Sequence, residues 1–455
     1  MSPQAAASRD TTLHLPQAGR SALWLALALA LSGCTSYAQR IRTPRELFYN
    51  GRVEQAAEQL EKQLKHAGKD RDVVALDLAM AQLFAGRPQE AEKLLRDVRN
   101  RFDYLEQKDL AEAALSYLTD DNRRAYAGED YEKVLIRVML ALADLMLGGQ
   151  DAEAYSLQVN AKQEQIIDGG ARLDEKNNPK TAYQRVAVGA YLHGVLREAT
   201  HHNYDDAERA FATVVSWQPG FPSALSDLRR VQSGRHSAPS HGVLYVFAFV
   251  GRGPFKVESS EVPTSQAMLI ADRILSAVGK HSLPPTLAAI KVPQVARYRN
   301  QVDRMLVVVD GRPRGTTDTI TNVGQMAVQQ CEAIHTHTLA RAVARRAVKK
   351  AAVYAVKDTT GANPLVSLAM DAAGVAWEAS ESADTRCWAL LPDSIQVLRL
   401  ELPAGEHMVE LGPARGTTSA GPTSRAAVRI EDGRNTYALV CCPEQVAGHV
   451  LVSGH

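Results

Sequence analysis

Gly242-Val-Leu-Tyr-Val-Phe-Ala-Phe-Val250 is a continuous apolar run in the middle of the chain. Its length and its aromatic and β-branched side chains favour a strand over a helix, and the lack of polar alternation predicts a strand buried on both faces. A second run, Met305-Leu-Val-Val-Val309, ends at the turn Asp310-Gly-Arg-Pro313 and is predicted to pair with the first strand. These runs indicate that a buried sheet lies at the centre of the second half of the chain.

The region 44–231, which precedes a polar linker at 232–241, has a helical pattern rich in Ala, Leu, Glu and Arg. A glycine is followed five residues later by an alanine in three places, and a fourth copy keeps only the alanine: Gly51 and Ala56, Gly86 and Ala91, Gly149 and Ala154, and Ala207. Glycine can end one helix, and a small residue lets the next helix pack closely. The first two copies lie 35 residues apart, close to the tetratricopeptide period of about 34 residues.

We therefore predict a tetratricopeptide-like helical array over 44–231. The later intervals of 63 and 53 residues depart from the period, so a generic domain of helical hairpins remains the alternative.

Two further regions follow the linker. Residues 242–380 are predicted to form an α/β middle domain, with a long helix between 322 and 357 and a shorter one at 364–377. Residues 381–455 are predicted to form a small antiparallel β domain with strands at 395–402, 407–411, 426–430 and 435–441. The predicted fold class is thus α+β multidomain.

The N-terminal segment Ala26-Leu-Ala-Leu-Ala-Leu-Ser-Gly-Cys-Thr35 ends an apolar run that is too short to span a bilayer and fits a secretory signal. Leu31-Ser-Gly-Cys34 resembles the lipobox of bacterial lipoproteins. We therefore expect a signal peptide at 1–33, a lipid on Cys34 and a tether at 34–43, with an ordinary cleaved signal as the alternative. Thr35 in place of aspartate, by resemblance to the lipoprotein sorting rule, predicts the periplasmic face of the outer membrane.

Charge and cysteine content limit the partners and the chemistry. The sequence has 52 Lys and Arg against 51 Asp and Glu. Removing the leader leaves 50 of each, which gives no electrostatic case for binding nucleic acid. Contact with the membrane is expected through the lipid anchor only. Cys387 could pair with Cys441 or Cys442 in an oxidising periplasm, but buried free thiols are the alternative.

No catalytic, metal or cofactor site is predicted. Glu378, Glu381 and Asp384 could serve hydrolysis, but Asp384 and Arg386 are expected instead to close a domain junction through hydrogen bonds. Trp388 is expected to be the aromatic joint of that junction, packed on the 364–377 helix. His335 and His337 lack the spacing of four that a helical zinc pair uses.

The basic residues of the long helix are predicted to form a solvated face rather than an anion-binding one. They are Arg341, Arg345, Arg346, Lys349 and Lys350.

Several short motifs occur in a distinctive order, among them Gly128-Glu-Asp-Tyr-Glu-Lys-Val134, Gly251-Arg-Gly-Pro254 and Asp384-Thr-Arg-Cys-Trp-Ala-Leu-Leu-Pro392. Through them the chain resembles a family of uncharacterised bacterial outer-membrane lipoproteins with tetratricopeptide-like repeats. That family is often associated with small lipoproteins that activate peptidoglycan synthases. The resemblance implies no catalytic residues, because the family has none established.

The function expected from the sequence is that of a lipid-anchored periplasmic scaffold, whose concave helical surface binds a protein partner of the envelope machinery. Two alternatives stay open: a glycan-acting enzyme that uses the acids near Trp388, and a lipoprotein for export or assembly of surface polysaccharide.

Overall fold

The computed structural model describes residues 37–111, 124–174, 176–278, 289–359 and 382–453. Residues 1–40 and Ile41–His455 are separate units, and the described part of the first is the short helix α2 (Tyr37–Arg40). Cys34 and the predicted signal peptide lie outside the described residues, as does the predicted helix at 364–377. Within the described ranges, no helix has the length and apolar character needed to cross a bilayer.

The apolar run around Tyr245 forms β1 (His241–Arg252), at the centre of a five-stranded sheet. β1 pairs in parallel with β11 (Asn435–Cys442) and antiparallel with β7 (Pro392–Pro403). The sheet is completed by β12 (Leu451–Val452) and β6 (Asp318–Asn322). Every β1 residue from 242 to 251 is buried, so the prediction of a strand covered on both faces is confirmed.

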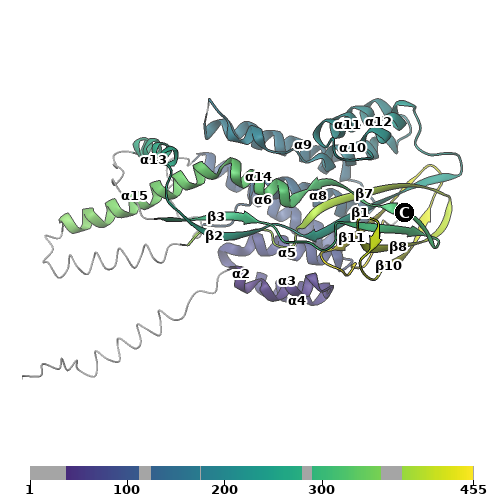
Figure 1. Cartoon of the computed structure of the whole chain (residues 1–455), viewed down its shortest axis with the longest axis horizontal. Helices are drawn as coiled ribbons and strands as arrows, with labels where there is room; N and C mark the ends of the chain where they lie inside the picture. The colour runs from purple at the N-terminus through teal and green to yellow at the C-terminus, as the bar shows by residue number, and fades with distance from the viewer. Residues whose placement is uncertain (1–36, 112–123, 175, 279–288, 360–381, 454–455) are drawn as a thin grey trace, which may run out of the picture. The chain divides into compact units, whose positions relative to one another are not determined.

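A second sheet covers one face of β1. Its strand order is β10 (Ser424–Ile430), β8 (Gly405–Arg415), β4 (Arg304–Val309) and β5 (Arg312–Thr316), and β9 (Thr418–Ser419) pairs with β8. One core contains side chains from both sheets, including Leu244, Val246, Val307, Val409 and Val428. The β region is therefore a sandwich of two sheets (Figure 1).

The expected pairing of Met305–Val309 with the first strand is wrong. This run forms β4, which pairs with β5 and β8 and lies across the core from β1. Burial alternates along β4, because its sheet is covered on only one face. Local sequence indicates that such a run is a strand, but its hydrogen-bonding partner depends on segments far along the chain.

The regions 242–380 and 381–455 contribute strands to the same sheets. β1 and β6 share one sheet with β7 and β11, and β4 lies beside β8 in the other. The four strands predicted after residue 381 are confirmed as β7, β8, β10 and β11. They do not form a sheet of their own, because β7, β8 and β11 each pair with a strand from an earlier part of the chain, whereas β10 pairs with β8.

The helical region consists of antiparallel pairs of contacting helices (Figure 1). The pairs are α3 (Arg42–Tyr49) with α4 (Val53–Leu64), α5 (Arg71–Phe84) with α6 (Pro88–Ala111), α8 (Asp130–Met146) with α9 (Ala152–Gly169), and α10 (Ala187–Glu198) with α11 (Tyr204–Trp217). α12 (Ala224–Gln232) packs against α11. Short 3-10 turns occur at Gly68–Asp70, Gly170–Arg172 and Pro179–Ala182.

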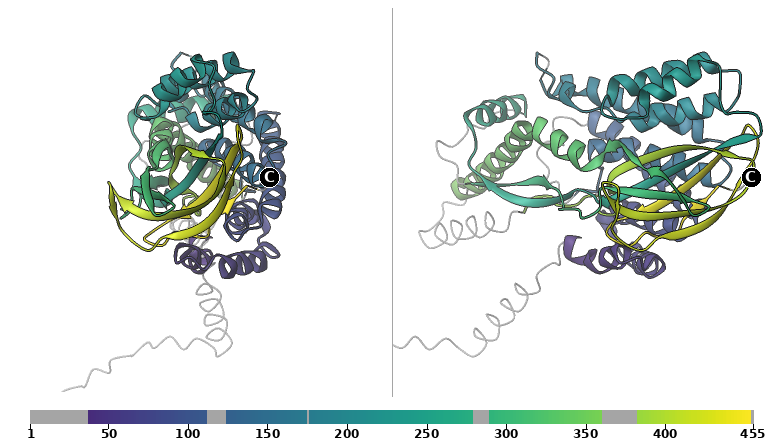
Figure 2. Two further views of the ribbon diagram at one scale, coloured as in Figure 1. Left: turned by 90° about the vertical axis from the view of Figure 1, so that its right-hand side faces the viewer. Right: turned by 45° about the vertical axis from the view of Figure 1, so that its right-hand side comes forward.

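The first helices of these pairs cover the other face of β1. The ring of Phe84 on α5 meets the ring of Phe249 edge to face at 5.4 Å, and Tyr191 on α10 lies 6.4 Å from Tyr245. Figure 2 shows the helices in an arc around the sheets. The protein therefore has helices, then the β1 sheet, then the second sheet, which explains why β1 has no polar face.

An additional α/β substructure follows β1. β2 (Phe255–Glu261) and β3 (Ile290–Ala296) form a two-stranded sheet, which packs with α13 (Ser265–Val278), α14 (Val323–Ala333) and α15 (His335–Thr359). The long helix predicted between 322 and 357 is instead two helices, because α14 ends at Ala333 with Ile334 as its C-terminal cap.

Candidate functional site

The repeat glycines lie at the turns between paired helices. Gly51, Gly86 and Gly149 have φ values of 75°, 78° and 73°, in the left-handed region that favours glycine. Two of the alanines that follow, Ala56 and Ala91, are fully buried in the second helix of their pair. These contacts fit the role predicted for the small residue.

The third copy does not fit its predicted frame, because Ala154 is exposed. The turn contains two glycines with positive φ, Gly148 and Gly149, and helix α9 begins only at Ala152. The fourth residue of the helix, which is the buried alanine in the other copies, is therefore Tyr155 in α9. Tyr155 is buried, and Val159 follows on the same face. In the fourth copy Ala207 is fully buried, as predicted.

The predicted junction residues meet at the inner side of the helices. The guanidinium of Arg386 donates to Asp384 from Nη2 at 2.7 Å and from Nε at 2.9 Å, and it contacts Asp70 Oδ1 at 3.2 Å. Burial acts to raise the pKa of Asp384, but the hydrogen bonds and charge of Arg386 together with the charge of Lys256 lower that pKa. Asp384 and Arg386 therefore form a buried ion pair, and Arg386 also packs over the ring of Tyr126.

Trp388 is fully buried beside this ion pair, and backbone bonds hold the segment around it. The Trp388 N–H donates to Glu132 on α8 at 2.7 Å, and the Leu390 N–H donates to Asp77 on α5 at 3.0 Å. The hydroxyl of Tyr49 on α3 donates to the Ala389 carbonyl at 2.8 Å. Three helices thus bind residues 388–390 in the way that a groove binds an extended peptide.

Sequence reasoning missed the two carboxylates of this contact, Asp77 and Glu132. A signal was present for Asp77, since it is the single polar residue in the otherwise apolar run from Val73 to Ala81. An isolated carboxylate on a buried helix face requires hydrogen-bond donors, and the Leu390 N–H supplies one.

A basic pocket of about 630 Å³ lies next to the junction. Elements that meet there include the end of α6, the loop before α8, the two-stranded sheet of β2 and β3, and the start of α15. The basic side chains among its described lining residues are Arg101, Lys108, Arg124, Lys180, Lys256, Arg341 and Arg386. The acidic ones are Glu129, Asp130 and Asp384.

Each lining acid pairs with a lining base. Lys256 binds Glu129, Lys180 Nζ lies 2.6 Å from Asp130, and Arg386 binds Asp384 as described above. The side chain of Lys256 is only 6% exposed. Burial acts to lower its pKa, but the carboxylates of Glu129 and Asp384 outweigh it and raise that pKa. Lys256 is therefore a fixed positive charge in the pocket wall.

The two histidines considered as metal ligands, His335 and His337, also line this pocket. Nε2 of His335 lies 2.8 Å from Oε2 of Glu261. Glu261 is thus an ion-pair partner of His335, and the two residues alone do not make a set of metal ligands. Within the described ranges, neither histidine belongs to a group of three side chains placed to hold a metal.

Part of the basic face predicted to be solvated is in fact covered. Arg346 is buried and donates to the Ala289 carbonyl at 3.0 Å. It is enclosed because α15 packs on β3 and α13, whereas Arg341 lines the pocket.

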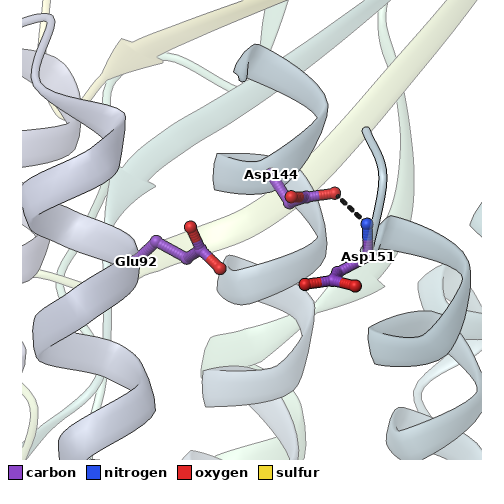
Figure 3. Close-up of side chains that lie close together, drawn as sticks. All are labelled: Glu92, Asp144 and Asp151. Carbon is purple, nitrogen blue, oxygen red and sulfur yellow. Dashed lines mark hydrogen bonds between the residues drawn. The ribbon is translucent and has the colours of Figure 1, made fainter. Parts of the chain in front are cut away.

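Glu92, Asp144 and Asp151 form the one group of candidate metal ligands found among the described residues (Figure 3). Glu92 already pairs with Arg96 and accepts a bond from Tyr155 at 3.0 Å. Asp144 accepts the Asp151 backbone N–H at 2.8 Å. Two of these carboxylates thus serve contacts around the α8–α9 turn, and we assign no metal to the cluster.

The remaining sequence candidates are three cysteines and two acids. Cys387, Cys441 and Cys442 are buried free thiols, and burial raises the pKa of Cys387 and of Cys442 to about 12. Glu378 and Glu381, considered as hydrolytic acids, lie outside the described residues.

Comparison of the chain with protein-family models, with curated proteins and with solved structures found no match. The resemblance to outer-membrane lipoproteins therefore rests on the sequence motifs alone.

Proposed function

We propose that this chain is a lipid-anchored adaptor of the bacterial cell envelope, held at the periplasmic face of the outer membrane by a lipid on Cys34. In this proposal the helical pairs are a tetratricopeptide-like array that binds a protein partner. The array is fused to the β sandwich, and the anchor is its only contact with the membrane.

The observation that carries the proposal is how the two sides of the helical pairs differ. Their inner side is filled by the protein itself, through Phe249, Tyr245 and Trp388. A partner therefore does not bind the concave surface that we expected from the sequence. The second helices remain available on the outer side, where Tyr104 on α6 is 56% exposed and Leu157 on α9 is 47% exposed.

Filling the inner side also suits an adaptor physically. In a stack of helical pairs, each pair contacts only its nearest neighbours, so the stack can bend. In this protein, hydrogen bonds from α3, α5 and α8 to residues 388–390 join successive pairs to one rigid segment. A partner that binds the outer side meets a surface that is already ordered, so it loses less conformational entropy on binding.

The lipid anchor is tested by metabolic labelling with a fatty-acid analogue. The wild-type chain is expected to take up label and to sediment with outer membranes, and Cys34→Ser is expected to do neither. Equal labelling of the wild type and Cys34→Ser would remove the anchor from the proposal.

The glycan-acting alternative is separated by incubating the purified chain with peptidoglycan. An adaptor is expected to release no soluble fragments and to stay in the supernatant. Released fragments would favour the enzyme, and sedimentation with intact peptidoglycan would favour a glycan-binding protein.

A further inference from the structure

The fourth helical pair is joined to the β sandwich by a contact between two histidine rings. His201 lies in the turn between α10 and α11, and His236 lies in the segment 233–240 that links α12 to β1. The centres of the two rings are 4.8 Å apart. Both rings also reach the chain around the start of β11. Nε2 of His201 lies 2.6 Å from the Gly433 carbonyl oxygen, and Nε2 of His236 lies 2.7 Å from Asn435 Oδ1.

We propose that this contact is a pH-sensitive latch, which is closed while His236 is neutral and opens when His236 takes up a proton. Opening separates the α10–α11 turn and the 233–240 segment from the β10–β11 turn, while the two sheets stay folded. The proposal goes beyond the adaptor function, because it concerns how the helices are attached to the sandwich and not what their outer side binds.

The backbone of the latch is held in a conformation that non-glycine residues rarely adopt. His201 has a φ of 62°, and Ser240 at the end of the linking segment has a φ of 64°. Glycines supply this conformation in the turns of the first three helical pairs. At other residues it costs free energy and persists only where the surrounding contacts hold it. The ring contacts of His201 therefore hold a strained turn, which relaxes when they break.

The closed latch offers a proton on His236 no compensating negative charge. His236 is buried, and its ring nitrogens contact Asn435 Oδ1 and, at 3.1 Å, Ser237 Oγ. Both partners are neutral. By contrast, the rings of His335 and His407 lie 2.8 Å and 2.7 Å from a carboxylate oxygen. A charge on His236 would thus be buried without an ion-pair partner, which is costly.

Several elements bring further titratable groups to the two rings. They are Glu198 on α10, His202 and Tyr204 at the α10–α11 turn, Asp227 and Arg230 on α12, Arg235 and His241 beside the linking segment, Arg399 and Glu401 on β7, Glu431, Asp432 and Arg434 in the β10–β11 turn, and Tyr245 and Tyr437 on the sheet. Within the described ranges, no acid is a hydrogen-bond partner of either ring. Burial lowers the pKa of His236 to about 4, and the charges of Arg399 and Arg230 act in the same direction.

These contacts couple opening to proton uptake. In the open state His236 takes up a proton near its ordinary pKa of about 6.5, whereas in the closed state its pKa is about 4. Between pH 7 and pH 5 this difference raises the equilibrium constant for opening about twentyfold. A proton on His201, whose ring centre is 4.8 Å from that of His236, adds to the effect because like charges at this distance repel.

The latch is tested by hydrogen–deuterium exchange of the full chain carrying Cys34→Ser at pH 7 and pH 5, with rates corrected for the intrinsic effect of pH. Exchange in peptides covering 199–204 and 233–241 is expected to rise about twentyfold at pH 5. It should also be at least about tenfold faster than exchange in β4 at both pH values, because the opening is local. Equal exchange in the latch peptides and β4 would show that the contact breaks only on global unfolding, and would overturn the proposal.

Two glutamine variants assign the pH dependence to one ring. His236→Gln keeps a donor for Asn435 but takes up no proton, so exchange in its latch peptides should change less than about threefold between pH 7 and pH 5. His202→Gln, at an exposed position beside His201, should keep the full increase. An equal increase in both variants and the parent, or no increase in the parent, would contradict the latch.

Asn435→Asp separates a titrating latch from a purely structural contact, and it serves as the test if His236→Gln does not fold. The new carboxylate would face Nε2 of His236 and raise the pKa of that ring, so the latch should stay closed at pH 5 and the increase in exchange should be lost. A structural contact would be loosened at both pH values, with the increase of about twentyfold retained. That second result would refute the proposal.

Discussion

The backbone N–H of Trp388 donates to Oε1 of Glu132 at 2.7 Å, although the two residues are 256 positions apart in the sequence. Both side chains are fully buried. Glu132 also accepts bonds from the hydroxyls of Tyr126 and Tyr131. This carboxylate therefore joins the helical region to the chain segment that enters β7, and its removal would leave several buried donors without an acceptor.

We predict that Glu132→Ala lowers the free energy of unfolding by about 3 kcal/mol, because each unsatisfied buried donor is costly. Glu90→Ala on the exposed side of α6 is the matched control and should change it by less than about 0.5 kcal/mol. Urea unfolding of both variants measures the difference. Similar values for the two would show that the Trp388 contact contributes little.

Trp388→Ala is predicted to cost about 3–5 kcal/mol through the cavity that it leaves. It should also expose residues 384–391 to protease, because the buried ring of Trp388 anchors the centre of this segment. Thermal melting and limited proteolysis measure both effects, with Trp388→Phe as a milder control. A variant that melts like the parent but is no longer retained on a peptidoglycan column would instead indicate a glycan platform.

Leucine substitutions of the repeat alanines are predicted to differ in their cost to stability, because two of these alanines are buried and one is exposed. Ala91→Leu and Ala207→Leu should each cost about 1–3 kcal/mol, because both alanines are fully buried and a larger side chain would overpack the contact. Ala154→Leu should cost less than about 0.5 kcal/mol, since Ala154 is exposed. Thermal melts provide the comparison, and a cost at Ala154 equal to that at Ala91 would restore the original frame.

His236 gives the structure a pH dependence. It is 2% exposed, with Nε2 lying 2.7 Å from Asn435 Oδ1, and burial lowers its pKa to about 4. The unfolded chain takes up a proton near pH 6.5 while the folded chain does not. Stability should therefore fall as pH drops from about 6.5 to 4, by up to about 3 kcal/mol.

The test compares urea unfolding at pH 7 and pH 5 for the wild type, His236→Gln and the exposed-site control His202→Gln. The loss on acidification should be about 2 kcal/mol smaller in His236→Gln than in the other two. An equal loss in all three would assign the pH dependence to other groups.

Local features of the fold could be predicted from the sequence. The run around Tyr245 is recognisable as a strand buried on both faces because it has no polar alternation, and the turn glycines mark helix ends correctly. Strand partners could not be predicted, because β4 carries the same apolar signal whether it lies beside β1 or across the core from it. The frame of the third repeat shifted because its turn has two left-handed glycines, Gly148 and Gly149.

The candidate site depended even more on distant contacts. Asp384, Arg386 and Trp388 could be recognised as a charged and aromatic cluster in one short segment. Their partners Asp70, Asp77 and Glu132 lie more than 250 residues earlier, and nothing local links them. The pocket cannot be predicted from the sequence, since Lys108, Arg124 and Arg341 come together only through the packing of α6, the loop before α8 and α15.

The adaptor proposal is tested most directly by site-specific photo-crosslinking in living cells. A photoreactive residue is placed at Tyr104 or Leu157 on the outer side of the helices, or at Met408 on β8, where the native side chain is 44% exposed. The account predicts the same discrete protein adduct from Tyr104 and Leu157 and none from Met408. No adduct from either helical position, or the same adduct from Met408, would contradict it.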